Sequence, residues 1–155
     1  MLDRPDFQEA LRIVFEEKIP FCRALNLKFR IVGGRAQVSF TKQDFMLGNT
    51  KLKVLHGGVT AAVLDSIAGA AVLLKMAEAD PKPDLETQLR EFNRVSTIDL
   101  RVDYLVPASA PAFLATATVT RLGKRIANVQ MALTDDAGTC VATGAAAFAL
   151  RAPRG

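Results

Sequence analysis

The chain has few of the residues from which most catalytic and metal sites are built. Its 155 residues include one histidine, two cysteines, one tyrosine and no tryptophan. The cysteines, Cys22 and Cys140, lie far apart with no CxxC partner, which argues against a disulfide framework and a zinc site. One histidine and no GxSxG motif argue against a Ser-His-Asp hydrolase, and no glycine-rich nucleotide-binding loop is present. We therefore expect neither a metal nor a cofactor.

The charge pattern excludes further classes. The net charge is +4, but there is no basic run and no RNA-binding or zinc-finger spacing, so we expect no nucleic-acid partner. The N-terminus lacks the basic start and unbroken apolar stretch of a signal peptide, and the cytoplasm is the expected location. The low-charge run over residues 54–74 is about as long as a membrane span. Because it is rich in Ala and Gly and holds His56, Asp65 and Ser66, it is better explained as a buried core helix.

Hydrophobic spacing predicts one α+β domain over residues 1–155. An N-terminal helix is expected at about residues 5–19, a hairpin around Gly33-Gly34, a loop at 43–54, the long apolar helix at 56–79, and a short inserted helix at about 84–94. Strands are expected at 97–107, 111–123, 125–136 and 138–151, the last three as an antiparallel meander. The predicted fold is an antiparallel sheet of five to six strands wrapped around one long central helix.

The stretch LHGGVTAAVLDSIAG, residues 55–69, is the most informative part of the chain. Gly57 and Gly58 open the long helix, where free N–H groups and the helix dipole attract a ligand oxygen. Asp65 follows on nearly the same face of the helix but about 11 Å along its axis. Within one chain this is too far for the Asp65 carboxylate and the glycine N–H groups to contact the same carbonyl. A second subunit would solve this. The alternatives are structural: Asp65 as a carboxylate bonded to Ser66 or the backbone, His56 as a cap, and the glycines as a tight turn.

Three stretches together resemble hotdog-fold acyl-CoA thioesterases of the PaaI-like type, close to the YigI-like branch. They are GNTKLKVLHGGVTAAVLDSIAG, STIDLRVDYLVPA and VTRLGKRIANVQMALTDDAGTCVATGAAAFAL, and the likeness covers about residues 22–150. The HGGxxxxxxD motif before TxDLxxxYLxPA is moderately specific, whereas HGG alone would be weak. The resemblance implies a hydrolase that splits an acyl- or aryl-CoA thioester, with coenzyme A as part of the substrate.

The same resemblance implies a catalytic set and its assembly. Two hotdog subunits pair so that Asp65 of one, as general base or nucleophile, faces the Gly57 N–H of the other, which is the oxyanion donor. Asn49 and His56 would orient the thioester and the water, and Thr97 falls where related enzymes place a Ser or Thr near that water. The minimum active unit would be a homodimer, and a homotetramer of two dimers is common in the family. Where some thioesterases have an assisting Thr, this chain has Gly69.

Further positions are candidates for substrate binding. Arg121, Lys124 and Arg125 flank a turn that could present positive charge to the phosphates of coenzyme A, although a solvated turn explains them equally well. Gly58 belongs to the helix opening, and Gly69 leaves room for an acyl chain or ring. Two other functions stay open: a non-catalytic acyl-CoA binding or sensing module on the same fold, and a hotdog dehydratase.

Overall fold

The computed structural model describes residues 2–151, so the ends of the expected domain, Met1 and residues 152–155, lie outside the described part. The architecture is a six-stranded antiparallel sheet curved around one long helix, as the sequence predicts. The strands are β1 (Lys28–Val32), β2 (Arg35–Thr41), β5 (Val95–Tyr104), β6 (Ala112–Leu122), β7 (Ile126–Asp135) and β8 (Cys140–Leu150). Their order in the sheet is β1-β2-β6-β7-β8-β5. The meander β6-β7-β8 is confirmed, and β5 pairs with β8 at the far edge.

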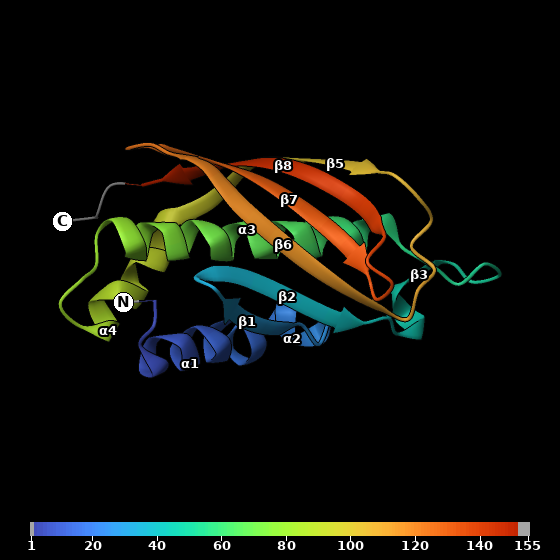
Figure 1. Ribbon diagram of the computed structural model, residues 1–155, viewed down its shortest axis with the longest axis horizontal. Helices are drawn as coiled ribbons and strands as arrows, with labels where there is room; N and C mark the ends of the chain where they lie inside the picture. Colours follow the sequence, from blue (N-terminus) through green and yellow to red (C-terminus); the bar gives the residue numbers. More distant parts are fainter. Residues whose placement is uncertain (1, 152–155) are drawn as a thin grey trace.

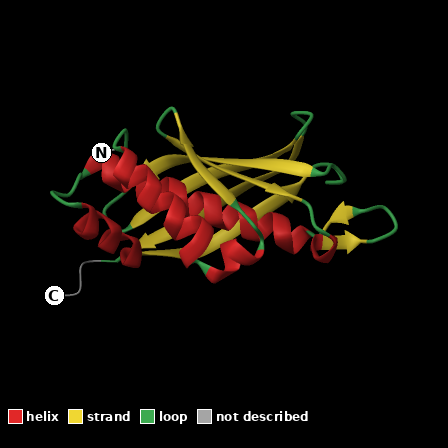
Figure 2. Ribbon diagram, turned by 90° about the horizontal axis from the view of Figure 1, so that it is seen from below, coloured by secondary structure: helices red, strands yellow, loops and turns green. Residues whose placement is uncertain are grey.

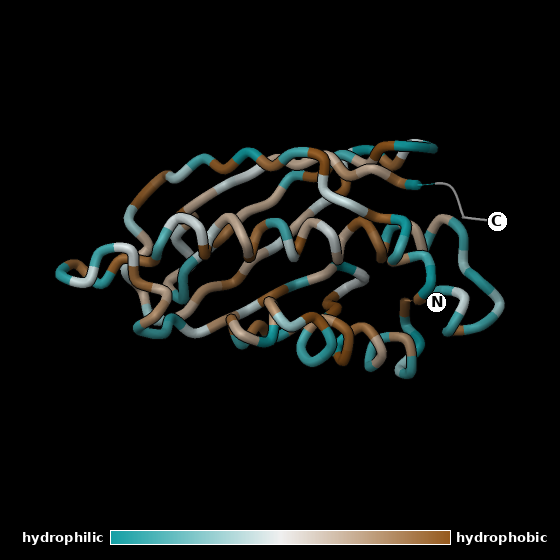
Figure 3. The backbone as a smooth tube through the Cα atoms, turned by 180° about the vertical axis from the view of Figure 1, so that it is seen from behind, coloured by the Kyte–Doolittle hydropathy of each residue, from teal (hydrophilic) through white to brown (hydrophobic). Residues whose placement is uncertain are grey.

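Helix α3 (Gly57–Ala79) is the centre of the core. It packs against β2, β5, β6, β7 and β8 and runs beneath the last strands in Figure 1. Seen from below, the helices lie in front of the strands (Figure 2). Side chains such as Leu64, Ile67 and Val72 are fully buried, and the α3 segment is largely white to brown in Figure 3. More than half of its most apolar 18-residue stretch, 56%, is buried, which fits the core helix predicted from the sequence.

The N-terminal segment differs in detail from the single helix expected at residues 5–19. It forms α1 (Pro5–Ile13), then a π-helical turn η1 (Val14–Lys18), and Pro20 starts a further helix α2 (Pro20–Ala24). Proline suits the first position of a helix because its missing N–H has no partner there. The Glu16 side chain in the π-turn accepts a hydrogen bond from the Phe29 N–H of β1 at 2.8 Å. The N-terminal segment therefore covers the β1 edge of the sheet.

The connections also depart from expectation at one place. Residues 43–54, expected as a loop, form a 3₁₀ turn η2 (Asp44–Met46) and a small hairpin of β3 (Leu47–Asn49) and β4 (Val54–Leu55). The inserted helix is confirmed as α4 (Leu85–Arg90), which continues as the 3₁₀ turn η3 (Glu91–Arg94). The first hairpin turns at Gly33 and Gly34 with φ of +56° and +74°, a conformation that glycine adopts without strain.

Candidate active site

Among the residues that the structure describes, the start of α3 leaves one backbone donor without a partner. His56 is the N-cap residue, and its Nδ1 accepts a hydrogen bond from the Gly58 N–H at 2.9 Å. The N–H groups of Val59 and Thr60 both donate to the His56 carbonyl, at 3.0 and 3.3 Å. Within residues 2–151 the Gly57 N–H is thus the one donor of the first turn that bonds to nothing. A ligand oxygen at this helix end would meet that N–H and the positive end of the dipole.

The hydrogen bond at this cap indicates which ring nitrogen of a neutral His56 carries the hydrogen. A backbone N–H can only donate, so the Nδ1 that faces Gly58 must be an unprotonated acceptor. A neutral imidazole then carries its hydrogen on Nε2, the other ring nitrogen. The ring is exposed, so this Nε2–H is available to a substrate or a water. Gly58 is needed for the same contact, because a Cβ there would lie 2.9 Å from Nδ1.

Tyr104, the single tyrosine of the chain, closes over the helix start from β5. Its hydroxyl donates to the Gly57 carbonyl oxygen at 2.7 Å. A Cβ on Gly57 would lie 3.2 Å from the tyrosine ring, so glycine is what lets the ring approach. Tyr104 belongs to the TxDLxxxYLxPA motif, but the sequence alone predicts no role for it. That Tyr104 is the single tyrosine was the one available signal. Its contact with Gly57 spans 47 residues of sequence, and the local pattern of residues does not reveal a contact of that range.

Asn49 and Gly57 border a common, mostly apolar cavity of about 460 Å³. The Asn49 Oδ1 accepts a hydrogen bond from the Leu52 N–H at 2.9 Å, which holds the β3–β4 turn. The cavity lies between this hairpin, the start of α3 and the segment that follows β5. Its lining residues are Asn49, Leu52, Val54, Leu55, Gly57, Thr60, Tyr104, Leu105, Val106, Pro107, Ala108, Val141 and Ala142. Such a cavity beside a free N–H suits a ligand with an apolar part and a carbonyl.

Asp65 and Thr97 form a second group. The Thr97 hydroxyl donates to Asp65 Oδ1 at 2.8 Å, and the aspartate is half-buried. Eight residues of helix separate Gly57 from Asp65, about 12 Å at 1.5 Å per residue. The described chain therefore does not bring the carboxylate to the Gly57 N–H. Ser66 was the alternative partner expected for Asp65. Its hydroxyl instead donates to the Ala62 carbonyl oxygen at 2.9 Å.

A β-bulge lets both Thr97 and Tyr104 face α3. The two residues are seven positions apart, and strict alternation would put them on opposite faces of β5. The pairing of β5 with β8 shifts register between Thr97 and Asp99, so Ile98 is the extra residue. After the bulge Leu100 and Val102 pack toward the core, in phase with Tyr104. The bulge therefore aims two side chains of one strand at two points of the helix.

Cys22 lies close to Asp65 but is not a candidate nucleophile. Its thiol is buried and contacts the Ser66 hydroxyl at 3.6 Å. Desolvation by burial raises the pKa of the Cys22 thiol, and the nearby charge of Asp65 raises it further. A raised pKa keeps the sulfur as the thiol, which is the unreactive form.

The remaining predicted substrate-binding residues lie on α3, at Gly69, and around the β6–β7 turn. A Cβ on Gly69 would make only an ordinary contact of 3.8 Å with Phe148, so the chain's own packing tolerates a larger residue there. Arg121, Lys124 and Arg125 are exposed around the β6–β7 turn and form no ion pair with any described residue. Lys124 borders a small cavity with Met76 and Ala79 at the C-terminal end of α3. These cations are thus far from Gly57 of the same chain.

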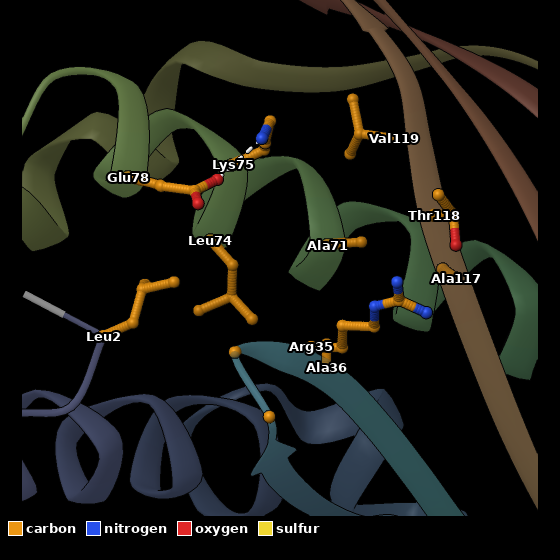
Figure 4. Close-up of a pocket in the computed structure, with 12 residues that line it drawn as sticks. Leu2, Arg35, Ala36, Ala71, Leu74, Lys75, Glu78, Ala117, Thr118 and Val119 are labelled. Atoms are coloured by element: carbon orange, nitrogen blue, oxygen red, sulfur yellow. Dashed lines mark hydrogen bonds and ion pairs between the residues drawn. The ribbon is translucent and has the colours of Figure 1, made fainter.

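A further cavity, of about 320 Å³, contains none of the predicted site residues. It lies between α3, β2 and β6 and is bordered by Arg35, Ala71 and Leu74, with the Lys75–Glu78 ion pair at its rim (Figure 4). At about 100° per residue these helix positions are turned away from Asp65. No group of three metal-ligating side chains occurs in the part of the chain that the structure describes.

Comparison with known proteins identifies the family of the chain. A sequence profile of the thioesterase superfamily matches residues 52–142. The chain is 35% identical over 148 residues to the medium/long-chain acyl-CoA thioesterase YigI of Salmonella typhimurium, covering 91% of this chain and 94% of that protein. YigI of Escherichia coli is 34% identical with the same coverage. A crystal structure of a Shewanella oneidensis protein related to the thioesterase superfamily superposes with a TM-score of 0.86 at 29% identity, covering 94% of this chain and 95% of that one.

The profile match includes the helix start, Asp65 and the strands β5, β6 and β7. The fold is that of the superfamily's solved hotdog structures. The protein is therefore a thioester hydrolase, and the chain belongs to the thioesterase superfamily.

Proposed function

We propose that the protein hydrolyses medium- or long-chain acyl-CoA thioesters in a site shared between two subunits, with Asp65 from one and Gly57 from the other. The substrate class follows from the relatives, which are named for it. The apolar cavity beside the free Gly57 N–H supports it, because the thioester of such a substrate joins a carbonyl to an apolar chain.

The open edge of the sheet supports the shared site. The β1 edge is covered by the N-terminal segment through Glu16 and Phe29. The other edge strand, β5, is ten residues long and pairs only with β8 among the described strands. Its Ile98 side chain is 54% exposed. A long edge with unpaired backbone groups is a template for a second chain.

The observation that carries the proposal is that β5 contacts the helix at two points. Near one end Thr97 bonds to Asp65, and at the other end Tyr104 bonds to Gly57. Two copies of β5 paired antiparallel about a two-fold axis near Leu100 and Arg101 would set Thr97 beside the partner's Tyr104. Neighbouring strands are about 4.8 Å apart. This symmetry carries Asp65 toward the partner's Gly57 and bridges the separation found within one chain.

The chemistry then follows from the two groups. The Gly57 N–H donates to the thioester carbonyl oxygen, where negative charge develops as the carbonyl carbon is attacked. Asp65 either takes a proton from the attacking water or attacks the carbon itself, giving an anhydride that water then hydrolyses. In both routes the C–S bond breaks and coenzyme A leaves as the thiol. Thr97 holds the carboxylate, and His56 Nε2–H and the Asn49 amide are donors for the substrate or the water.

The basic turn fits the coenzyme end of the same site. Lys124 borders the same cavity as Ala79, in the last turn of α3. Ala79 follows Asp65 by 14 residues, which is about 21 Å along the helix axis. An extended phosphopantetheine arm has a comparable reach. Arg121, Lys124 and Arg125 would therefore serve the site that contains Asp65 of their own chain, and bind the phosphates of coenzyme A.

Release of free thiol from a panel of acyl-CoA substrates tests the activity. We expect turnover to rise from short to medium and long acyl chains. Binding of these substrates without thiol release would contradict the proposal and would indicate an acyl-CoA binding module. Single turnover in ¹⁸O-labelled water can reveal the nucleophilic route, because label enters Asp65 only when water attacks the Asp65 carboxyl carbon of the anhydride; the general-base route labels only the released acid.

Replacing Ile98 by lysine is expected to weaken the subunit pairing. A charged side chain at the bulge of the edge strand would be desolvated when a second β5 approaches. Light scattering across a dilution series should show dissociation at a higher concentration than for the unmodified protein, and activity per subunit should fall in parallel. Ile126→Lys is the matched control, because Ile126 is 47% exposed but lies on the inner strand β7. An active monomer would contradict a shared site.

Replacing Gly69 by valine is expected to shift the acyl-chain preference. The position lies one turn after Asp65 on the same face, and its own chain leaves space there. If an acyl chain uses that space, kcat/KM for long chains should fall about tenfold or more, while short chains are hydrolysed nearly as before. Ala145→Val, which adds similar bulk at an exposed position of β8, should leave the preference unchanged. Equal losses for all chain lengths would show that Gly69 has another role.

A further inference from the structure

The peptide unit between Gly57 and Gly58 is held at both of its polar ends by side chains. Its carbonyl oxygen, on Gly57, accepts from the Tyr104 hydroxyl at 2.7 Å. Its N–H, on Gly58, donates to His56 Nδ1 at 2.9 Å. The two side chains come from different elements, β5 and the residue that caps α3, so they fix this peptide plane from two sides.

Such a restraint matters because glycine is otherwise the least restrained residue. With no Cβ at 57 or 58, the backbone here has more accessible conformations than at any other pair of residue types. A carbonyl oxygen has two lone pairs, so the tyrosine bond adds to the helical bond that Gly57 can accept. Fixing the 57–58 peptide restricts rotation at Gly57, and the direction of the neighbouring Gly57 N–H depends on that rotation.

We propose that Tyr104 is a positioning residue for the oxyanion donor, acting through the Gly57 carbonyl. This inference rests on the proposed function, in which the Gly57 N–H is the donor. Tyr104 also connects the donor to the subunit interface, because it stands at the end of the open strand β5. Pairing of β5 with a partner would thus restrain the same tyrosine that orients the donor.

The ring of Tyr104 provides a second, independent link to Gly57. The Cβ of an alanine at this position would lie 3.2 Å from the Cζ and hydroxyl oxygen of the tyrosine, tighter than a relaxed contact. Either the ring or the helix start would have to move, and both movements change where the donor points. The loss of kcat caused by a methyl group at position 57 should therefore depend on whether the tyrosine ring is present.

The first test is Tyr104→Phe, which removes only the hydroxyl. We expect kcat to fall about tenfold to a hundredfold with KM nearly unchanged, because a misdirected donor stabilises the transition state less but binds the substrate as before. The melting temperature and the dimer should be retained. Thr120→Val is the control: it also removes one hydroxyl that bonds to a backbone carbonyl, that of Asn128 at 3.2 Å, and should leave kcat unchanged. Unchanged kcat in Tyr104→Phe, or loss of the dimer along with kcat, would overturn the inference.

The second test is a double-mutant cycle of Gly57→Ala with Tyr104→Ala. If the added methyl group meets the tyrosine ring, Gly57→Ala should lower kcat by a much smaller factor in the Tyr104→Ala background than in the unmodified protein. Equal factors in both backgrounds would overturn the link. The Asp65→Asn variant separates this inference from the proposed function. An inactive Asp65→Asn protein beside a fully active Tyr104→Phe protein refutes only the role of Tyr104, whereas an active Asp65→Asn protein refutes the proposed function.

Discussion

Asp65→Asn is expected to lower kcat by roughly a hundredfold or more, because a positioned acid–base group typically contributes about 10²- to 10⁴-fold. Asparagine keeps the size of the side chain and can still accept the hydrogen bond from Thr97, so the substitution removes the charge and little else. Steady-state thiol release with a medium-chain acyl-CoA measures the effect.

Stability should not follow activity in this variant. Asp65 is half-buried and makes no ion pair with any described residue, so a neutral amide costs no more to accommodate. The melting temperature should therefore stay near that of the unmodified protein. A variant that melts early or loses its dimer while hydrolysing substrate at the original rate per folded subunit would show that Asp65 serves the fold.

Mixing two inactive variants is expected to restore activity, which is the most direct test of a shared site. Gly57→Ala keeps the backbone N–H, but its added Cβ would lie 3.2 Å from the Tyr104 ring and displace the donor. It should therefore be strongly impaired, since an oxyanion donor contributes about 10²- to 10³-fold in kcat. In a dimer of one Gly57→Ala chain and one Asp65→Asn chain, one site carries both substitutions and the other carries neither. Random reassortment gives half heterodimers, so activity should return to about a quarter of the unmodified value in the mixture and to about half of it in the purified heterodimer.

The controls for this experiment are the two homodimers, in which each variant is paired with itself. Subunits are exchanged by co-expression with two affinity tags, and the doubly tagged species is purified and assayed for thiol release. Neither homodimer should recover. If the purified heterodimer is as inactive as its parents, then Asp65 of one chain and Gly57 of the other do not act on the same thioester. That result would contradict the shared site.

The sequence predicted the fold well because its strongest signals are local. Apolar runs, the Gly33-Gly34 turn and the proline-bounded helix each depend on neighbours in the chain, and all appear where expected. The β3–β4 hairpin was missed because its strands have only three and two residues, too short for a period to be visible. Helix α2 was missed because Pro20, which ends the first helical pattern, also starts another.

The site was less accessible to sequence reasoning for a geometric reason. Asp65 and Gly57 could be proposed from the sequence because a carboxylate and a glycine pair are unusual in an apolar helix. The alignment of Thr97 and Tyr104 on one face could not, because alternation along β5 predicts opposite faces and only the bulge at Ile98 changes it. A bulge leaves no mark in the hydrophobic pattern of an exposed edge strand.

The position of α3 in the chain has a consequence for synthesis on the ribosome. The helix ends at Ala79, but much of its apolar surface is covered by β6, β7 and β8, the last of which ends at Leu150. At about 5–20 residues per second, roughly 4–14 s pass between the two events. During that interval a helix apolar enough to resemble a membrane span is without most of its cover. Nascent chains that stop before β8 should therefore be the form that chaperones hold, and the completed meander is what releases them.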